Sequence, residues 1–270
     1  MQLSQQRGKS IMKLEYNYST RIKFSSDIER HNILLRCQPA NEVFQKVVSE
    51  MVYFDDGYWL KEGHDGFGNR VISGGTNLLH STLKYTSLGV VEQTTYCIPD
   101  PVPHPMFSLP SALTGMSQLP TLNSNMAFLD RCFEIMHLVH HHIDYTCNVT
   151  TMQTTAMDVW NSKKGVCQDY AHLMVALCRA AGMPARYVCG LMSGEGQTHA
   201  WVEVHDGMCW YAFDPTNDTA IANGYIKLAH GRDALDCPVS RGTYRISPHS
   251  ASDAMQNEQS FISVMVKEIK

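Results

Sequence analysis

The sequence lacks the features that place a chain in a membrane or on a nucleic acid. No apolar run in its 270 residues approaches the ~18 that a membrane-spanning helix needs. Its net charge is only −4, and 18% of its residues are charged, a balance that gives no reason to expect binding to nucleic acid or to an anionic membrane. We therefore expect a globular protein that has neither of these as a partner.

An export signal and a disulfide framework are also missing from the sequence. Residues 1–12 have no apolar segment of the kind that a signal peptide carries, so they predict a disordered leader, with Met12 as a second candidate start. The nine cysteines are odd in number and widely spread, which favours reduced thiols over disulfides. The expected location is the cytoplasm. No calcium-binding loop pattern is visible, and no cofactor is expected.

The chain divides by composition. Residues 13–98 predict an antiparallel sandwich of short strands, because alternating or apolar runs are separated by glycine-rich turns. The expected strands are 14–22, 32–37, 45–54, 78–83 and 89–95, with turns at 55–57, 63–69 and 73–75. Residues 99–122 hold six prolines and predict a linker or a wrapped strap. Residues 123–246 follow as the core, and 247–270 as a strand and tail that we expect to return to the first sheet.

Cys167 stands apart from the other cysteines by its setting. It follows Gly165 and precedes a helical pattern of apolar residues that Gly182 and Pro184 end. Unpaired amides and the positive end of the dipole at a helix N-terminus favour the thiolate form of a cysteine. Cys178 and Cys189, by contrast, are interpreted as small buried hydrophobic residues.

A histidine and an aspartate are predicted to face each other across a hairpin. Residues 199–205 and 208–214 are strand-like and flank Asp206-Gly207, which favours a two-residue type I′ turn. In that register His199 lies opposite Asp214, with Cα atoms about 5.5 Å or less apart, unless a bulge shifts the pairing. By itself such a pair is more typical of a surface contact between strands, but together with Cys167 it supplies the groups that nucleophilic catalysis by cysteine requires.

These segments resemble a known family. G-V-C-Q-D-Y-A-H-L from Gly165, H-A-W-V-E-V from His199 and F-D-P-T-N from Phe213 are similar to the core domain of bacterial transglutaminase-like proteins, over about residues 125–245. The resemblance implies an α+β, papain-like core in which a helix bearing the cysteine packs on an antiparallel sheet, after an N-terminal β-sandwich-like domain. It also implies that Cys167 is the nucleophile, that His199 is the general base and acid, and that Asp214 orients the imidazole.

Other residues enter the expected site with less support. Gln168 and Trp160 are candidates for a second oxyanion donor, and Trp201 is a candidate wall of the substrate pocket. His137 and His141 are spaced so that they could share a metal, but adjacent histidines on a solvated helix end explain them better, and no metal is expected. Residues 231–233 and 241–242 are interpreted as a structural Arg–Asp brace.

The sequence therefore predicts a cysteine-dependent acyl-transfer enzyme that attacks peptide or side-chain amides of a protein substrate through a thioester. The absence of a visible regulatory segment or calcium loop favours hydrolysis, as in a protease or amidase, over cross-linking. The alternatives are a protein-glutamine gamma-glutamyltransferase and a non-catalytic peptide-binding module on the same fold. The oligomeric state and the role of the β-rich domain are not legible in the sequence.

Overall fold

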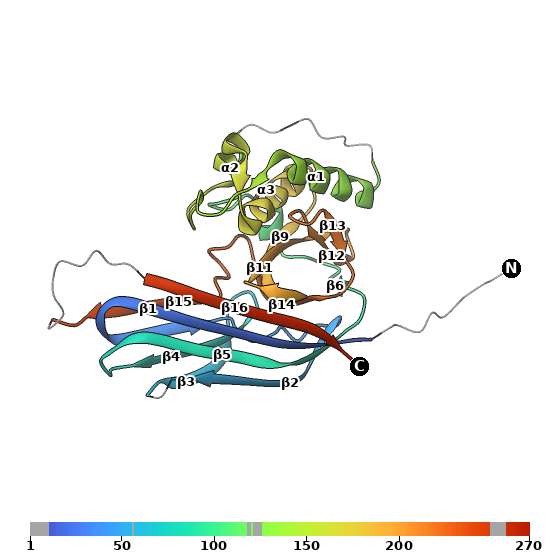
Figure 1. Cartoon of the computed structure of the whole chain (residues 1–270). Helices are drawn as coiled ribbons and strands as arrows, with labels where there is room; N and C mark the ends of the chain where they lie inside the picture. The colour runs from blue at the N-terminus through green and yellow to red at the C-terminus, as the bar shows by residue number, and fades with distance from the viewer. Residues whose placement is uncertain (1–10, 56, 118–119, 121–125, 249–257) are drawn as a thin grey trace.

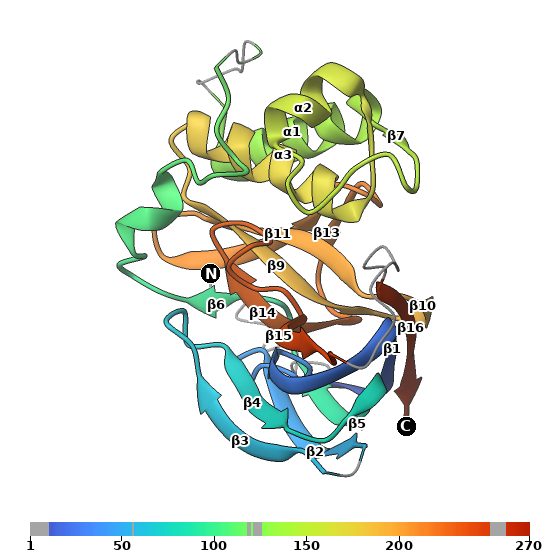
Figure 2. The same ribbon diagram turned by 90° about the vertical axis from the view of Figure 1, so that its left-hand side faces the viewer.

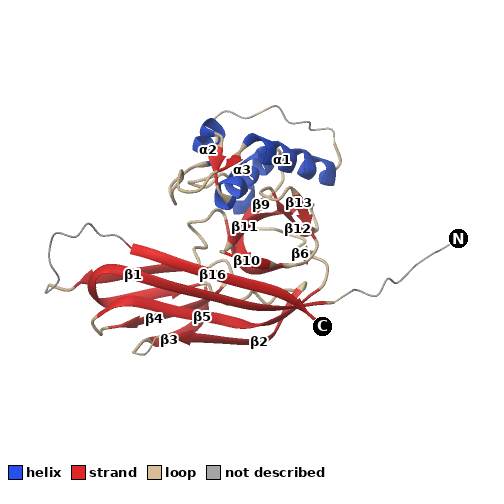
Figure 3. Ribbon diagram, in the orientation of Figure 1, coloured by secondary structure: helices blue, strands red, loops and turns tan. Residues whose placement is uncertain are grey.

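The computed structural model describes residues 11–55, 57–117, 120, 126–248 and 258–270. Within these residues, helices cover one face of a central antiparallel sheet, and a second, longer sheet lies against its other side (Figures 1 and 3). This is the helix-on-sheet α+β architecture expected for the core, joined to a β-rich domain. Most of the expected leader, residues 1–10, and residues 249–257 of the expected tail lie outside the described residues.

The central sheet and its helices carry the expected core. The sheet has the order β13-β12-β11-β9-β14, with β6 beside β12. Its strands are β6 (Ile98–Pro99), β9 (Ala185–Met192), β11 (His199–His205), β12 (Cys209–Asp214), β13 (Thr219–Ile221) and β14 (Tyr225–Gly231). The helical layer is made of α1 (Phe128–His142), α2 (Ala156–Ser162) and α3 (Cys167–Ala180), with the short parallel pair β7 (Asp144–Tyr145) and β8 (Lys164–Gly165).

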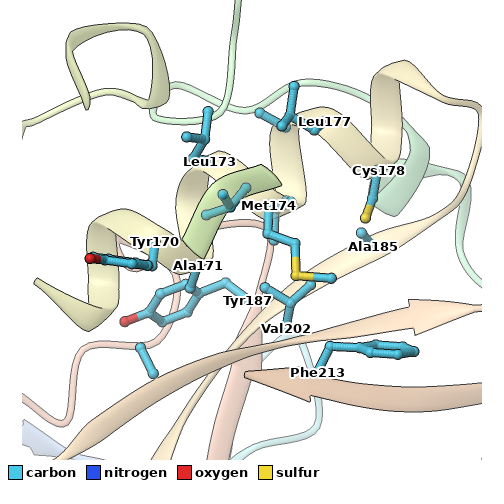
Figure 4. Close-up of a cluster of buried hydrophobic side chains, with 14 of the residues drawn as sticks. Tyr170, Ala171, Leu173, Met174, Leu177, Cys178, Ala185, Tyr187, Val202 and Phe213 are labelled. Atoms are coloured by element: carbon cyan, nitrogen blue, oxygen red, sulfur yellow. The ribbon is translucent and has the colours of Figure 1, made fainter. Parts of the chain in front are cut away.

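Helix α3 is buried because its apolar side chains point both to the sheet and to its neighbouring helices. Met174 reaches toward Val202 and Phe213 of the sheet, as Figure 4 shows, and all three are fully buried. The sequence pattern predicted this helix and its end. The helix stops at Ala180, and Gly182 follows with a φ of 76°, a conformation in which glycine carries no steric cost.

The longer sheet curls on itself. It comprises β1 (Met12–Leu35), β2 (Gln45–Phe54), β3 (Trp59–His64), β4 (Arg70–Thr76), β5 (His80–Gln93), β10 (Gly194–Gly196), β15 (Ser240–Ile246) and β16 (Glu258–Ile269). The first half of β1 pairs with β5 and β16, and its second half pairs with β4 and β15. Register shifts near residues 23–32 turn the strand between these halves, so both leaves share one buried cluster. The sandwich-like domain predicted from the sequence is confirmed.

Some predicted strands are parts of longer strands, and one predicted turn in this sheet was wrong. The runs at 14–22 and 32–37 belong to one strand, β1, and those at 78–83 and 89–95 fall in another, β5. Residues 73–75 were predicted as a turn but lie inside β4. A Cβ at Gly74 would lie 2.6 Å from the carbonyl oxygen of Trp59, and one at Gly89 would lie 2.1 Å from that of Ser49. These glycines permit close contact between strands rather than a reversal of the chain.

The proline-rich segment wraps the core. The short helix η1 (Pro105–Ser108) follows β6, and the Phe107 carbonyl accepts a hydrogen bond from the Arg179 guanidinium of α3. Farther along, the Leu113 carbonyl accepts from the Ala156 amide at the start of α2. Residues 99–122 were predicted to form either a linker or a wrapped strap. Their described part packs against the core as a strap.

The chain ends in the sheet in which it began. Strand β16 pairs with β1 from Lys13 opposite Ile269 to Phe24 opposite Glu258, as the alternation in the tail predicted. Strands β10 and β15 come from the stretch assigned to the core but also join this sheet. No helix in the described part of the chain is long and apolar enough to cross a membrane.

Candidate active site

The three side chains singled out in the sequence converge where the helical layer meets the central sheet. Cys167 is the first residue of α3, His199 the first of β11 and Asp214 the last of β12. The Nε2 atom of His199 lies 2.7 Å from Oδ2 of Asp214. This leaves Nδ1 free to face the thiol, and Cys167 is close enough to the imidazole to raise its pKa. The order thiol, imidazole, carboxylate is the arrangement that an activated cysteine nucleophile needs.

The hairpin that pairs His199 with Asp214 differs from the predicted one. Val202 lies opposite Phe213 and His205 opposite Trp210, so four residues rather than two connect the strands. Gly207 has a positive φ of 106°, but Asp206 does not, and a type I′ turn needs both. The register is therefore shifted by two residues. Because side chains alternate with period two, this shift keeps His199 and Asp214 on the same face as diagonal neighbours within reach of each other.

Five hydrogen bonds hold the Asp214 carboxylate. Besides His199, its Oδ2 accepts from Asn217 Nδ2 at 2.7 Å and from the Tyr225 hydroxyl at 2.9 Å. Its Oδ1 accepts from the amides of Thr216 and Asn217. Burial alone would raise the pKa of this carboxyl, but the hydrogen bonds and the charge of His199 lower it below its usual value. Asp214 therefore stays ionised and fixed in orientation.

The imidazole of His199 is held in its charged form. Burial lowers the pKa of His199, but the hydrogen-bonded Asp214 carboxylate and the neighbouring Cys167 outweigh burial and raise it to about 10. His199 is therefore an imidazolium at neutral pH, next to the thiol of Cys167. A positive charge beside a thiol at the start of a helix favours a thiolate, which is the reactive form of cysteine.

The first turn of α3 is built around Asp169. Its Oδ2 accepts from the Val166 amide at 2.8 Å and from the Thr150 hydroxyl at 2.7 Å, which closes the N-terminus of the helix. A Cβ at Gly165 would lie 2.7 Å from this same oxygen, so only glycine fits at this position, two residues before Cys167. The amides of Cys167 and Gln168 belong to a first turn that has no preceding turn to bond. They are donors available to an oxyanion formed near the thiol.

A cavity of about 770 Å³ contains the thiol and the imidazole. One wall is formed by residues 145–150, after α1, and another by residues 192–198, between β9 and β11. Gln168 lines this cavity, in agreement with a role near the substrate. The volume is within the range of small-ligand and peptide side-chain pockets, roughly 300–1,000 Å³.

Trp160 and Trp201 do not line the cavity, so their predicted positions were wrong. The Trp160 ring stacks on His142 with centroids 3.9 Å apart, and it packs against the helical core. Trp201 is completely buried below His199, and its indole N–H donates to the Tyr96 hydroxyl. Both tryptophans were predicted from their closeness in sequence to Cys167 or His199. Trp160 lies in α2, which ends before Cys167, and Trp201 packs in the layer between the two sheets.

The histidines and arginines considered in the sequence for a metal site or a brace lie outside the catalytic cavity. His137 bonds Asp218 at 2.5 Å and His141 bonds the His137 carbonyl, and the described residues contain no group of three or more side chains arranged to hold a metal. The predicted brace is not formed by the expected residues. Arg232 pairs with Asp236, and Arg241 lies in β15 opposite Leu34.

Two contributors to the site were missed in the sequence. Asn217 follows Asp214 by three residues, and the F-D-P-T-N motif contains it, but an Asp-Pro turn did not by itself indicate that the amide would return to the carboxylate. Tyr225 reaches Asp214 from β14, a strand on the far side of β9, and no local pattern in the sequence predicts that contact.

Comparison with known proteins agrees with this geometry. Residues 120–215 match the family model of the transglutaminase-like superfamily. An uncharacterized protein of Mycobacterium leprae is 36% identical over 112 residues, which are 38% of this chain and 40% of that one. A protein-glutamine gamma-glutamyltransferase of Pseudomonas aeruginosa is 30% identical over 129 residues, 40% of this chain and 19% of the relative. The matches thus cover less than half of these relatives' length.

A solved structure resembles the whole chain. The crystal structure of a "putative cysteine protease" from Cytophaga hutchinsonii aligns with a TM-score of 0.76, over 97% of this chain and 92% of that one. The sequence identity is 21%, so the likeness concerns the fold. It extends through the β-rich domain as well as the core.

Proposed function

We propose that the chain is a cysteine-dependent enzyme that cleaves peptide or side-chain amides through a thioester, because residues 120–215 match the family model of the transglutaminase-like superfamily. The observation that carries the proposal is the connected series of Cys167, His199 and Asp214 within one cavity. A binding module would have no use for a histidine held as an imidazolium against a thiol.

The first half of the reaction forms the thioester. The Cys167 thiolate attacks the amide carbonyl carbon, and the carbonyl electrons move to oxygen. First-turn amides of α3 stabilise this oxyanion, an effect that amounts to roughly 3–4 kcal/mol per donor in comparable sites. The imidazolium of His199 then gives its proton to the leaving nitrogen as the C–N bond breaks. Asp214 keeps the ring oriented while its charge changes.

The second half consumes the thioester. Neutral His199 takes a proton from water, the resulting hydroxide attacks the acyl carbon, and the thiolate leaves as the imidazolium re-forms. The cavity around Cys167 is lined by polar side chains such as Asn148, Thr150 and Gln197, which suit water at this step. We therefore favour hydrolysis.

A second candidate is transfer of the acyl group to an amine. The relative from Pseudomonas aeruginosa named a protein-glutamine gamma-glutamyltransferase favours it. The chemistry differs only in the nucleophile of the second half, because an amine replaces water and forms a new amide. The same three side chains serve both reactions, so the triad does not distinguish them.

The test is turnover of quenched fluorescent peptides that contain glutamine, followed by mass spectrometry with and without dansylcadaverine. We expect cleavage or deamidation by the parent and by Cys97→Ala, whose thiol lies outside the cavity, and none by Cys167→Ala. Incorporation of the amine in place of hydrolysis would support the second candidate. Equal turnover by the parent and Cys167→Ala would overturn both.

A further inference from the structure

Strand β10 is an edge strand that borders the catalytic cavity. Within the described residues it pairs with β16 alone, Gly194 opposite Val266 and Gly196 opposite Val264. Figure 2 shows it beside β16 at one margin of the long sheet. All three of its residues are exposed, and Glu195 and Gly196 line the cavity that holds Cys167 and His199. Its outer edge therefore presents main-chain donors and acceptors next to the nucleophile.

The backbone of this edge is open to another chain. A Cβ built on Gly194 or Gly196 would meet no atom within 4 Å, so the face of the strand at both glycines is uncovered. The glycines on each side of Glu195 also carry no side chain that could obstruct a second backbone at the strand spacing of about 4.8 Å. An extended peptide added to such an edge obtains its affinity from main-chain hydrogen bonds and its specificity from side-chain pockets.

The cavity carries one uncompensated charge. Glu195 is the one carboxylate among the described residues that line it, and no lysine or arginine lies in that lining. The positive charge of His199 is paired with the buried Asp214 carboxylate behind it. The lining is therefore net negative, which complements a cationic side chain.

We propose that the substrate is an extended peptide that pairs with the free edge of β10, and that Glu195 selects a lysine or arginine side chain near the bond attacked by Cys167. This inference rests on the proposed function and names its substrate class. It also gives the β-rich domain a role, because that domain supplies β16 and β1, which hold β10 in place.

The charge selection is tested with peptidyl acyloxymethyl ketones, in which the Cys167 thiolate displaces a carboxylate to form a stable thioether. Matched probes carry lysine or norleucine, which have similar length, at each of the three residues before the ketone. We expect the lysine probe to label Cys167 about three- to fivefold faster at one position, the size expected for a solvent-accessible ion pair. Glu195→Gln should remove this preference, and Glu195→Lys should reverse it.

A matched control is Glu268→Gln, which makes the same charge change on β16 away from the cavity and should keep the lysine preference. Iodoacetamide labelling of Cys167 is measured in every variant and should be unchanged, which shows that the nucleophile and fold are intact. Absence of a lysine preference in the parent, or its persistence in Glu195→Gln, would overturn the selection by Glu195. If iodoacetamide instead labelled Cys167 at the same rate in the parent and in His199→Ala, the proposed function would be overturned.

The strand pairing is tested separately with singly N-methylated versions of the lysine probe. Only alternate N–H groups of an antiparallel strand point to its partner. We expect methylation at alternate residues to slow labelling at least tenfold, while methylation between them changes it little. Uniform effects along the probe would contradict pairing with β10.

Discussion

Asp214 has a role set by its charge as much as by its position. Donors from β11, β14 and the turn after β12 saturate both of its oxygens, so the carboxylate cannot rotate or take up a proton easily. Its negative charge opposes the effect of burial on His199. The protonation state of the imidazole therefore depends on this carboxylate together with the neighbouring Cys167.

Replacing Asp214 with asparagine is predicted to lower the pKa of His199. Burial lowers this pKa, and Asp214 and Cys167 both raise it, so without the carboxylate the pKa should fall from about 10, with only Cys167 left to oppose burial. Activity should drop by roughly a hundredfold or more. Ring-carbon NMR of His199 against pH measures the shift.

Tyr225→Phe is the matched control for this change. It removes a hydrogen bond to the same carboxylate but leaves the charge, so the titration of His199 should stay near 10. A His199 titration unmoved by Asp214→Asn would show that the carboxylate does not set the charge of the imidazole.

At the scale of elements, the start of α3 is arranged around the side chain of Asp169. The carboxylate bonds the Val166 amide and the Thr150 hydroxyl, and Gly165 passes directly beside it. These contacts join the loop after α1 to the helix that carries the nucleophile. The position of Cys167 thus depends on an element that contains none of the reacting groups.

Gly165→Ala is predicted to displace this arrangement. The added methyl would meet Asp169 at 2.6 Å, which we expect to cost about 1–3 kcal/mol of unfolding free energy and to reduce kcat/KM at least tenfold. Urea unfolding and peptide turnover measure the two effects. Gly66→Ala is the control, since its Cβ would meet nothing within 4 Å, and it should change neither. Full activity in Gly165→Ala would show that the helix start tolerates a shift of Asp169.

Local patterns predicted the elements better than their pairing. The apolar spacing and the Gly182 end signal were sufficient for α3, because a helix is held by contacts within its own sequence. The Asp206-Gly207 hairpin was found, but its turn type was wrong, because the register is set by pairing with β9 as well as by the turn. Gly74 resembled a turn residue because close strand contact and chain reversal both require a missing side chain.

At the scale of the whole molecule, a buried charge network joins the two sheets. Glu203 on β11 pairs with Arg186 and with Lys227, whose ammonium also bonds Glu42 of the β-rich domain at 3.1 Å. Burial raises the pKa of Glu203, but Arg186 and Lys227 outweigh it and lower the pKa to about 2. No local pattern in the sequence indicates this network, because its members lie far apart along the chain.

Glu203→Gln is predicted to be among the more destabilising single changes, at about 3–5 kcal/mol, because it removes the carboxylate partner of the buried Arg186 and leaves Lys227 paired with Glu42 alone. Urea unfolding at pH 7 measures it. Glu15→Gln, which breaks an exposed pair with Lys267, should cost less than about 1 kcal/mol.

Since the folded pKa of Glu203 is depressed, its contribution to stability is complete above about pH 4.5 and should be lost as the pH falls through about 2. A change of under 1 kcal/mol in Glu203→Gln would contradict the network's role.

The measurement that bears most directly on the central claim is the rate of alkylation of Cys167 by iodoacetamide at pH 6, followed by peptide mass spectrometry. An ordinary thiol has only about 0.3% thiolate at this pH. The imidazolium of His199 should keep Cys167 reactive, so we expect labelling in the parent to be at least tenfold faster than in His199→Ala, with the partly exposed Cys209, which lies outside the cavity, as internal reference. Equal rates for Cys167 in the two proteins would contradict the thiolate–imidazolium pair and favour a binding module on this fold.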